Sequence, residues 1–539
     1  MTVPSLAGGD TARSRAAWQG LRLIAAVSTG LLLVLAFPGP DLGPVAFVAL
    51  IPLLLAVETA RPRQAAALGF VAGLVFFVLH IWWINVFGYL PLAALSLVQA
   101  VVLAGFAALV PATRQLGAWR LLALPACWAA LELARAHAPL GGFPWGILGL
   151  TQHGGGPLLP LARVVGVYGI SAVIVAVNLA AAMALRGVFA ARGGGRSLRP
   201  AVGWAVLAAA LPFAGLVAPG APPADTGAAA LDLVAVQGNV PGIDRADRPD
   251  QRQADAMTFA NHLRMTRELA KQTSPDLVIW GEGAVNDDPL RNPDLAFGIR
   301  QAAEAAGSPM LVGASTEPSP GHFATEALLY DAQGGLLDRY AKRRLVPFGE
   351  YVPGGRLMRE LVPATNQVGL DKQPGRRLAP MTVDGVRFGV IACWESAYAE
   401  DARQLARDGA RFLVVITNNS SWGVVPGSAQ HLATSQLRAV EEGRTVVHVA
   451  VSGISAVVDP DGVARQETGL YTQASLRAAV PPRSGLTLYA RFGRLFELAL
   501  VGVALAALVA AALLRRRAAP PAAEPISPRP QHVSTRGGS

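Results

Sequence analysis

The sequence predicts a bundle of about eight transmembrane helices joined to an α/β domain that lies outside the membrane. Of the 539 residues, 52% are hydrophobic and only 15% are charged, a composition too apolar for one ordinary soluble domain and a length that favours more than one domain. Apolar runs fill the first 220 residues or so and return near the C-terminus, while short β-rich runs lie between them. The long apolar runs predict the helical membrane domain, and the short β-rich runs predict a separate α/β domain.

Crossing the hydrocarbon core takes roughly 17 to 25 apolar residues. Runs near that length lie at Leu23–Phe37, Pro44–Val57, Ala66–Ile84, Leu90–Ala112, Leu121–Ala136, Leu161–Leu185, Val202–Ala218 and Leu495–Leu514. The first run ends in AFPGP rather than in a small-x-small cleavage site, so we interpret it as a retained anchor and not a signal peptide. The predicted domains are a membrane domain with seven helices (1–219), an extracytoplasmic α/β domain (228–490), a C-terminal transmembrane helix (495–514) and a disordered cytoplasmic tail (515–539).

Arginines gather in every second loop between the predicted spans, whereas the alternate loops hold few. The clusters are Arg13, Arg15 and Arg22; Arg61 and Arg63; Arg114 and Arg120; Arg186, Arg192, Arg196 and Arg199; and Arg515, Arg516 and Arg517. Because cationic residues in short loops stay on the cytoplasmic side, both termini are predicted to be cytoplasmic and the α/β domain to lie outside. This pattern also explains the net charge of +10 without nucleic acid as a partner.

The outer segment alternates β-rich and helical stretches bounded by Gly, Pro, Asp and Asn. Expected strands are LDLVAVQ, DLVIW, ATEALLY, VRFGVIA, FLVVIT, TVVHVAV and ISAVVD. Expected helices cover Ala254–Lys271 and Gln430–Glu442, the second ending at Gly443, and Pro460 to Gly462 form a turn. These elements predict a single α/β domain of about 260 residues, near the upper end of the usual domain size.

Cys393, in the stretch GVIACWES, is one of only two cysteines, so no disulfide framework is possible. It follows an apolar strand, and two readings are open. Cysteine is often a buried small hydrophobe, but a side chain at the end of a strand can also be presented to substrate. As a nucleophile, the thiol needs a base or a cation nearby, because its ordinary pKa leaves it protonated at neutral pH.

Candidates for both groups lie at other strand ends. Glu282 follows the strand DLVIW between two glycines, and Lys342 and Glu350 lie in YAKRRLVPFGEYVP. Each could instead be a solvated surface charge. Lysine is rare here, with three among 46 basic residues, so its use beside two arginines suggests that a compact ammonium is needed.

The order Glu282, Lys342, Cys393 resembles the Glu-Lys-Cys triad of the nitrilase, or carbon-nitrogen hydrolase, superfamily. Combined with the membrane spans, it resembles the apolipoprotein N-acyltransferase family. Four further motifs match that family: AVQGNVPG, GGFPWGILGLTQ, KRRLVPFGEYVP and LTLYARFG. The resemblance implies a nitrilase-like αββα sandwich for the outer domain and covers almost the whole chain.

The resemblance also implies roles. Cys393 would be the nucleophile, Glu282 the general base and Lys342 the group that stabilises the oxyanion. Glu350 would orient the site, and Trp394 and Glu395 would border an acyl pocket. The donor would be a membrane phospholipid and the acceptor the α-amino group of a diacylglyceryl-cysteine at a lipoprotein's N-terminus. The chain would act as a monomer in the bacterial cytoplasmic (inner) membrane, with no metal or organic cofactor.

Several alternatives stay open from the sequence. Trp145 and Trp422 could cover the site or contact an acyl chain, or could anchor at the membrane interface. Glu132 and Arg135 could pair on one helix face, where Arg135 could meet a lipid headgroup or simply pack. The chain departs from the family pattern at Gly281, at Trp394 and near Ser420, where an acidic residue is usual. The rival functions are a membrane-tethered amidohydrolase that uses water, and a transporter or receptor with an inactive outer domain.

Overall fold

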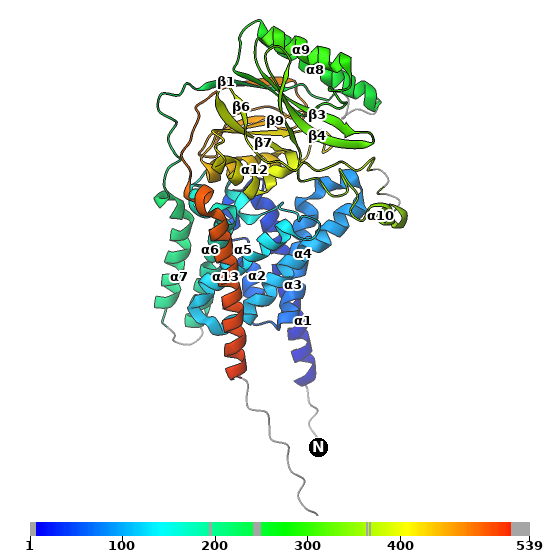
Figure 1. Ribbon diagram of the computed structural model, residues 1–539. Helices are drawn as coiled ribbons and strands as arrows, with labels where there is room; N and C mark the ends of the chain where they lie inside the picture. The colour runs from blue at the N-terminus through cyan, green and yellow to red at the C-terminus, as the bar shows by residue number, and fades with distance from the viewer. Residues whose placement is uncertain (1–6, 193–196, 241–249, 363–364, 366–367, 519–539) are drawn as a thin grey trace, which may run out of the picture.

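The computed structural model describes residues 7–192, 197–240, 250–362, 365 and 368–518, and it has a helical bundle with an α/β domain stacked on one end (Figure 1). The start of α1 and the end of α13 both lie at the opposite end of the bundle. The predicted tail differs in part: residues 515–518 form the last turn of α13, and 519–539 lie outside the described residues.

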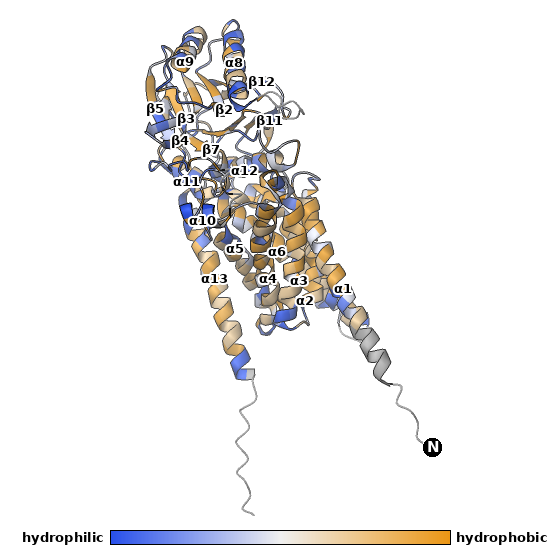
Figure 2. Cartoon of the chain, turned by 90° about the vertical axis from the view of Figure 1, so that its right-hand side faces the viewer, coloured by the Kyte–Doolittle hydropathy of each residue, from blue (hydrophilic) through white to orange (hydrophobic). Residues whose placement is uncertain are grey.

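Seven helices among the described residues are long and apolar enough to cross a membrane. The helices of the bundle are α1 (Ala7–Ala36), α3 (Pro62–His80), α4 (Tyr89–Ala112), α5 (Arg120–His137), α6 (Ala162–Arg192), α7 (Arg199–Ala210) and α13 (Leu488–Ala518). Their hydrophobic surfaces contrast with the mixed polarity of the α/β domain (Figure 2). The predicted membrane bundle is therefore confirmed as a set of long apolar helices.

The predicted second span, Pro44–Val57, is not one continuous helix. It consists of a 3-10 helix, η1 (Gly43–Phe47), and the short α2 (Ile51–Val57). At 1.5 Å per residue the whole segment reaches only about 22 Å, less than the hydrocarbon thickness of about 30 Å. Polar side chains of neighbouring helices bind the backbone where the helix is interrupted: Leu50 N–H donates to Asn178 Oδ1 (2.8 Å) and Leu53 N–H to Thr29 Oγ1 (3.1 Å).

The α/β domain contains two six-stranded sheets, with strand orders β12-β1-β2-β3-β4-β5 and β11-β10-β9-β8-β7-β6. The strands are β1 (Leu231–Gln237), β2 (Leu277–Val285), β3 (Met310–Ser319), β4 (His322–Tyr330), β5 (Leu336–Ala341), β6 (Met381–Val383), β7 (Val386–Ala392), β8 (Leu413–Thr417), β9 (Val446–Ala450), β10 (Ala456–Val458), β11 (Ala464–Glu467) and β12 (Ala474–Val480). Since β1, β2 and β3 are parallel, as are β7, β8 and β9, the carboxyl ends of each group share one edge.

Helices cover the outer face of each sheet, which makes the predicted αββα sandwich. The covering helices are α8 (Gln251–Ala270), α9 (Pro293–Ala306), α11 (Ala399–Arg407) and α12 (Gly427–Glu442). The short α10 (Gly355–Leu361) lies to one side, near the end of the bundle (Figure 1). Apolar side chains of both sheets form the central core, and a second core lies under α8 and α9. In Figure 1, α8 and α9 lie at the end away from the bundle, whereas α12 lies between the second sheet and the membrane helices.

Candidate active site

Cys393 lies where β7 turns into a short 3-10 helix, η8 (Cys393–Ala397). Its φ of 49° is in the left-handed region, which few non-glycine residues occupy. Such strained positions gather at functional sites. The turn lifts the thiol out of the strand, so of the two readings of Cys393 the geometry favours a presented side chain.

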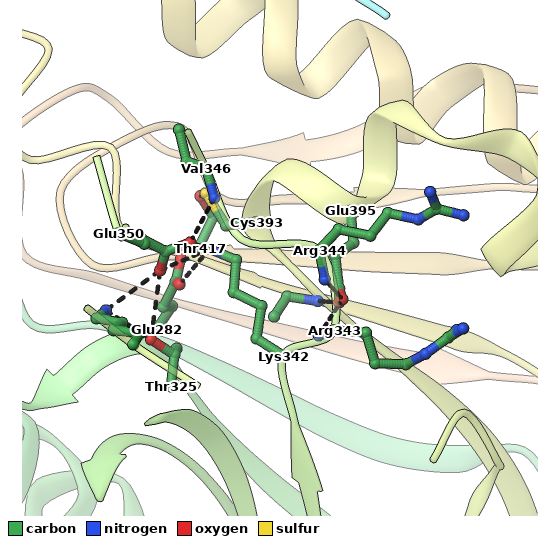
Figure 3. A network of polar contacts seen from close by, with 12 residues as sticks. Glu282, Thr325, Lys342, Arg343, Arg344, Val346, Glu350, Cys393, Glu395 and Thr417 are labelled. Carbon is green, nitrogen blue, oxygen red and sulfur yellow. Dashed lines mark hydrogen bonds and ion pairs between the residues drawn. The ribbon is translucent and has the colours of Figure 1, made fainter. Parts of the chain in front are cut away.

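Four charged side chains of alternating sign form a chain beside Cys393 (Figure 3). Lys342 Nζ donates to Glu282 Oε1 at 3.0 Å and to Glu350 Oε1 at 3.1 Å. Lys372 Nζ lies 3.2 Å from the same Glu350 oxygen and donates to Thr325 Oγ1 at 2.7 Å. Two lysines thus alternate with two glutamates, and the structure brings together the predicted residues Glu282, Lys342, Glu350 and Cys393.

The charges of this cluster follow from its geometry. Burial alone would lower the pKa of Lys342, but Glu282, Glu350 and Cys393 outweigh it and hold that pKa well above its usual value. Burial opposes ionisation of Glu350, yet Lys342 and Lys372 lower its pKa to about 2. Lys342 and Glu350 are therefore charged in the resting enzyme.

The thiol itself is protonated at rest. Burial, reinforced by the negative charge of Glu282, raises the pKa of Cys393 to about 12, although Lys342 acts in the opposite direction. A buried thiol of this kind reacts only when a base removes its proton during attack. Glu282 is the carboxylate whose charge acts on the thiol most strongly, which suits it to this task.

Glu395, which the resemblance places at the border of an acyl pocket, is held by four hydrogen bonds. Its Oε1 accepts the backbone N–H groups of Arg343 (2.7 Å) and Arg344 (3.0 Å). Its Oε2 accepts the Tyr340 hydroxyl (2.7 Å) and the Ala392 N–H (2.9 Å). With four donors on two oxygens and 1% exposure, Glu395 ties the segment that carries Lys342 to the turn that carries Cys393.

An aromatic cluster, formed by Trp83, Phe143, Trp145, Trp394 and Trp422, adjoins the turn that contains Cys393. Trp145 and Trp394 stack with ring centroids 5.6 Å apart, and Trp422 meets Trp145 edge-on at 6.1 Å. The cluster joins a loop of the membrane domain to the residue after Cys393. The three tryptophans predicted near the site therefore lie together.

Gln430, the fourth residue of α12, holds two of these indoles. Its Oε1 accepts Trp145 Nε1–H at 2.7 Å and Trp83 Nε1–H at 3.1 Å, while its Nε2 donates to the His80 carbonyl at 3.0 Å. A side chain of the α/β domain thus fixes aromatic rings of the membrane domain.

Arg135 and Glu132 pair as predicted, at 3.9 Å, and both act on one loop. Arg135 donates to the carbonyls of Phe143 (3.0 Å), Trp145 (2.7 Å) and Gly146 (2.7 Å), and Glu132 Oε1 accepts the Leu148 N–H at 2.8 Å. Arg135 is buried, so the structure places it in packing against this loop rather than on a headgroup. The pair holds the Trp145 loop against the site.

The comparisons with known proteins agree with this architecture. Residues 29–180 match the apolipoprotein N-acyltransferase N-terminal domain family and residues 236–482 the carbon-nitrogen hydrolase family. An apolipoprotein N-acyltransferase of Geobacter metallireducens is 32% identical over 507 residues, which cover 90% of this chain and 94% of that protein. The chain belongs to the apolipoprotein N-acyltransferase family. The resemblance inferred from the motifs is thereby confirmed, and with it the assignment to the acyltransferases.

Two further proteins are similar to this chain. The apolipoprotein N-acyltransferase of Caulobacter vibrioides is 30% identical, with coverage of 90% of this chain and 93% of its own. Among solved structures, an amidase from Nesterenkonia sp. covers 50% of this chain and 99% of its own length at 18% identity, with a TM-score of 0.36.

One of the departures from the family pattern has a local explanation. A Cβ on Gly281 would lie 2.9 Å from the Thr417 carbonyl oxygen and 3.0 Å from the Val451 nitrogen, so glycine allows the two sheets to approach beside Glu282. Near Ser420, where the family usually has an acidic residue, the backbone carbonyl accepts the Tyr471 hydroxyl at 2.9 Å. Within the described residues, no group of three or more His, Cys, Asp or Glu side chains could hold a metal ion.

Three residues at the site were not anticipated from the sequence: Lys372, Thr417 and Gln430. The rarity of lysine was a usable signal for Lys372, since two of the three lysines meet at Glu350. Thr417 ends the predicted strand FLVVIT, at the edge where polar side chains gather. Gln430 had no distinguishing signal, because it lies inside a predicted helix.

If Cys393 is the acylated nucleophile, replacing Lys372 by methionine is expected to slow its acylation roughly tenfold, the equivalent of about one pKa unit of lost electrostatic support. Without Lys372, the Glu350 carboxylate would interact more strongly with the Lys342 ammonium. The measurement is the rate at which labelled phospholipid modifies the full-length enzyme. Lys271→Met, which removes an exposed lysine at the end of α8, is the matched control, and equal rates for the two variants would contradict the expectation.

Proposed function

We propose that this chain transfers a fatty acyl group from a membrane phospholipid, through a thioester on Cys393, to the α-amino group of the diacylglyceryl-cysteine at the N-terminus of an apolipoprotein. The proposal rests on the family and on one observation above all. Lys342, only 2% exposed, is held between Glu282 and Glu350 beside a thiol on a strained turn. A fixed buried cation beside a nucleophile suits a reaction in which an oxyanion develops.

In the first half-reaction, Glu282 takes the thiol proton as Cys393 Sγ attacks the ester carbonyl carbon of the phospholipid. The carbonyl oxygen becomes an oxyanion, which the Lys342 ammonium stabilises. When the tetrahedral intermediate collapses, the C–O bond breaks and the lysophospholipid alkoxide leaves with the proton from Glu282. The acyl group remains on Sγ as a thioester, and Glu282 is again a carboxylate.

In the second half-reaction, the α-amino nitrogen of the lipoprotein attacks the thioester carbonyl, and Glu282 accepts the proton that this nitrogen loses. Lys342 stabilises the second oxyanion. The C–S bond then breaks, Cys393 leaves as a thiolate that recovers a proton from Glu282, and the product is an amide. Every group used in one half-reaction is thus restored by the end of the other.

The membrane helices support the proposal that the substrates of both half-reactions are lipids. The aromatic cluster lies between the membrane helices and Cys393, where an acyl chain could leave the bilayer without crossing water. The last turn of α13, which contains Arg515, Arg516 and Arg517, lies at the end of the bundle away from the α/β domain (Figure 1). By the positive-inside rule this end would be cytoplasmic, which puts the α/β domain on the extracytoplasmic side of the bacterial inner membrane. Since one chain supplies the whole triad, we propose that a monomer is active.

The test uses purified full-length enzyme and phospholipid with a labelled acyl chain. The expected result is an acyl adduct on the enzyme that hydroxylamine removes, and no adduct on Cys393→Ala. An adduct of equal yield on Cys393→Ala would exclude the mechanism. Adding a diacylglyceryl peptide should then move the label to the peptide, whereas release of free fatty acid alone would favour an amidohydrolase-type enzyme that uses water.

Trp394→Ala is expected to slow acylation by phospholipid about tenfold, because each lost aromatic contact contributes about 0.5–1.5 kcal/mol beyond its buried area. Trp394 packs on Phe143 and Trp145. Trp394→Tyr keeps a ring in the cluster and should stay near the wild-type rate. If both variants slow acylation equally, the ring stack is not what binds the acyl chain.

A further inference from the structure

Thr417, the last residue of β8, contacts the sulfur of the nucleophile. Its hydroxyl oxygen lies 3.2 Å from Cys393 Sγ and 2.9 Å from Asn419 Oδ1 (Figure 3 shows Thr417 beside Cys393). Thr417 is fully buried, so solvent does not compete for these contacts. In the part of the chain that the structure describes, no other side chain donates a hydrogen bond to this sulfur.

One hydroxyl proton cannot serve both acceptors at once. A neutral thiol is a weak acceptor, and the amide oxygen of Asn419 is both closer and stronger, so in the resting enzyme the proton points toward Asn419. A thiolate accepts far more strongly, because hydrogen bonds to an ionised partner are about twice as strong as neutral ones. Ionisation of Cys393 should therefore turn the hydroxyl from Asn419 to the sulfur.

Among the described groups near Cys393, Thr417 is the one placed to donate a hydrogen bond to the ionised sulfur. His431 Nε2 lies 3.0 Å from the Cys393 carbonyl oxygen, and its Nδ1 lies 3.3 Å from Asn419 Oδ1 and 3.4 Å from Thr417 Oγ1. Burial lowers the pKa of His431 to about 4, so the ring is neutral at physiological pH and supplies no charge to the thiolate. The titratable groups that face the thiol are Glu282 from β2, Lys342 and Glu350 from the segment after β5, and His431 from α12.

We propose that Thr417 is a further catalytic residue, whose hydroxyl donates to Sγ while Cys393 is a thiolate and to Asn419 while the sulfur is a thiol or a thioester. This donor would assist both the attack of the sulfur on the donor ester and its departure when the amine displaces it. No atom is transferred, since the hydroxyl keeps its proton and only rotates. The role in acyl transfer rests on the proposed function, but the effect on the thiol does not.

The test measures alkylation of Cys393 by iodoacetamide in the full-length enzyme as a function of pH. Mass spectrometry of the peptide that contains Cys393 separates it from Cys127. Thr417→Val keeps the shape and removes the donor. It should slow alkylation at neutral pH roughly tenfold and move the profile upward by about one pH unit. Thr417→Ser keeps the hydroxyl and should follow the wild type, as should Thr258→Val, which removes a buried hydroxyl on the distant α8.

A second variant predicts the opposite sign. Because partial unfolding would expose the thiol and would also move the profile to lower pH, thermal unfolding of this variant must match that of the wild type. Asn419→Gly removes the competing acceptor and tolerates the φ of 57° at this position. The remaining competitor is then His431 Nδ1, at the longer distance of 3.4 Å, so the hydroxyl is more available to the sulfur and the alkylation profile should move to lower pH. A Thr417→Val profile equal to the wild type, or an Asn419→Gly profile at higher pH, would overturn the proposal, and if Thr417→Val does not fold, the Asn419→Gly profile decides.

Because alkylation requires no lipid, the role of Thr417 can be tested even if the proposed acyl transfer does not occur. If the phospholipid assay yields no adduct while the two alkylation profiles move in opposite directions, the proposed function is wrong and the role of Thr417 stands. If acylation occurs but neither profile moves, the function stands and the role of Thr417 is wrong.

Discussion

Lys342→Met is expected to lower the rate of acyl-enzyme formation about a hundred- to a thousandfold, the usual loss when one oxyanion-stabilising group is removed. The same change leaves two buried carboxylates, Glu282 and Glu350, without their shared cation. Removing one partner of a buried ion pair typically destabilises a protein by about 3–5 kcal/mol. Labelled phospholipid measures the rate, and thermal unfolding of the full-length enzyme measures the stability.

Arginine at this position should not restore the rate, although it restores the charge. Lys342 fits a site in which its Nζ lies 3.0 Å and 3.1 Å from two glutamate oxygens and the side chain is 2% exposed. A planar guanidinium is larger and presents its donors in a fixed fork. Lys271→Met controls for the loss of a lysine alone. Wild-type acylation by Lys342→Arg would show that only the charge matters and would contradict this account.

The second large effect is expected for Glu282→Gln, which should slow acylation about a hundred- to ten-thousandfold, the range that a positioned general base contributes. Glutamine preserves the shape and can still accept the hydrogen bond from Lys342, so the fold should be little affected. Rates measured across pH should rise with pH more steeply in the variant than in the wild type, because hydroxide must then generate the thiolate.

Glu268→Gln, on the exposed face of α8, is the matched control for this substitution. Acylation by Glu282→Gln at the rate of that control would exclude Glu282 as the base and would turn attention to Glu350, the other carboxylate on Lys342.

Much of the fold was accessible from the sequence because its signals are local. The strands LDLVAVQ and VRFGVIA coincide with β1 and β7, and Gly443 ends α12 with a φ of 62°. Among the strands that were missed, β5, β6, β11 and β12 lie at sheet edges, whereas β3 lies inside the first sheet. Exposed side chains interrupt the apolar pattern of β11 and β12, and both contain charged residues. Their strand state depends on pairing with distant partners, which a local pattern does not contain.

The site, like the fold, contains features that the sequence predicted and features that it did not. The triad was predicted from the order of three motifs, and the structure places all three residues in one cluster. The role of Glu395 could not be read from its place two residues after Cys393, because the left-handed turn at Cys393 sends successive side chains in different directions. Gln430 and Lys372 reach the site through folding that brings α12 and the segment before β6 to the same edge.

The burial of α12 limits how the α/β domain can move relative to the membrane helices during a reaction cycle. This helix is buried along its whole length, with the second sheet on one side and membrane helix α6 on the other. Any tilt of the α/β domain would open that contact to water, including Leu437 and Val440, which lie in the apolar core of the membrane helices. If Cys393 is the nucleophile, as proposed, it therefore stays at one depth relative to the membrane helices, and each lipid substrate would have to rise or turn in its own leaflet to reach it. The choice of substrate would then depend partly on how far the reacting ester or amine can be lifted from the membrane.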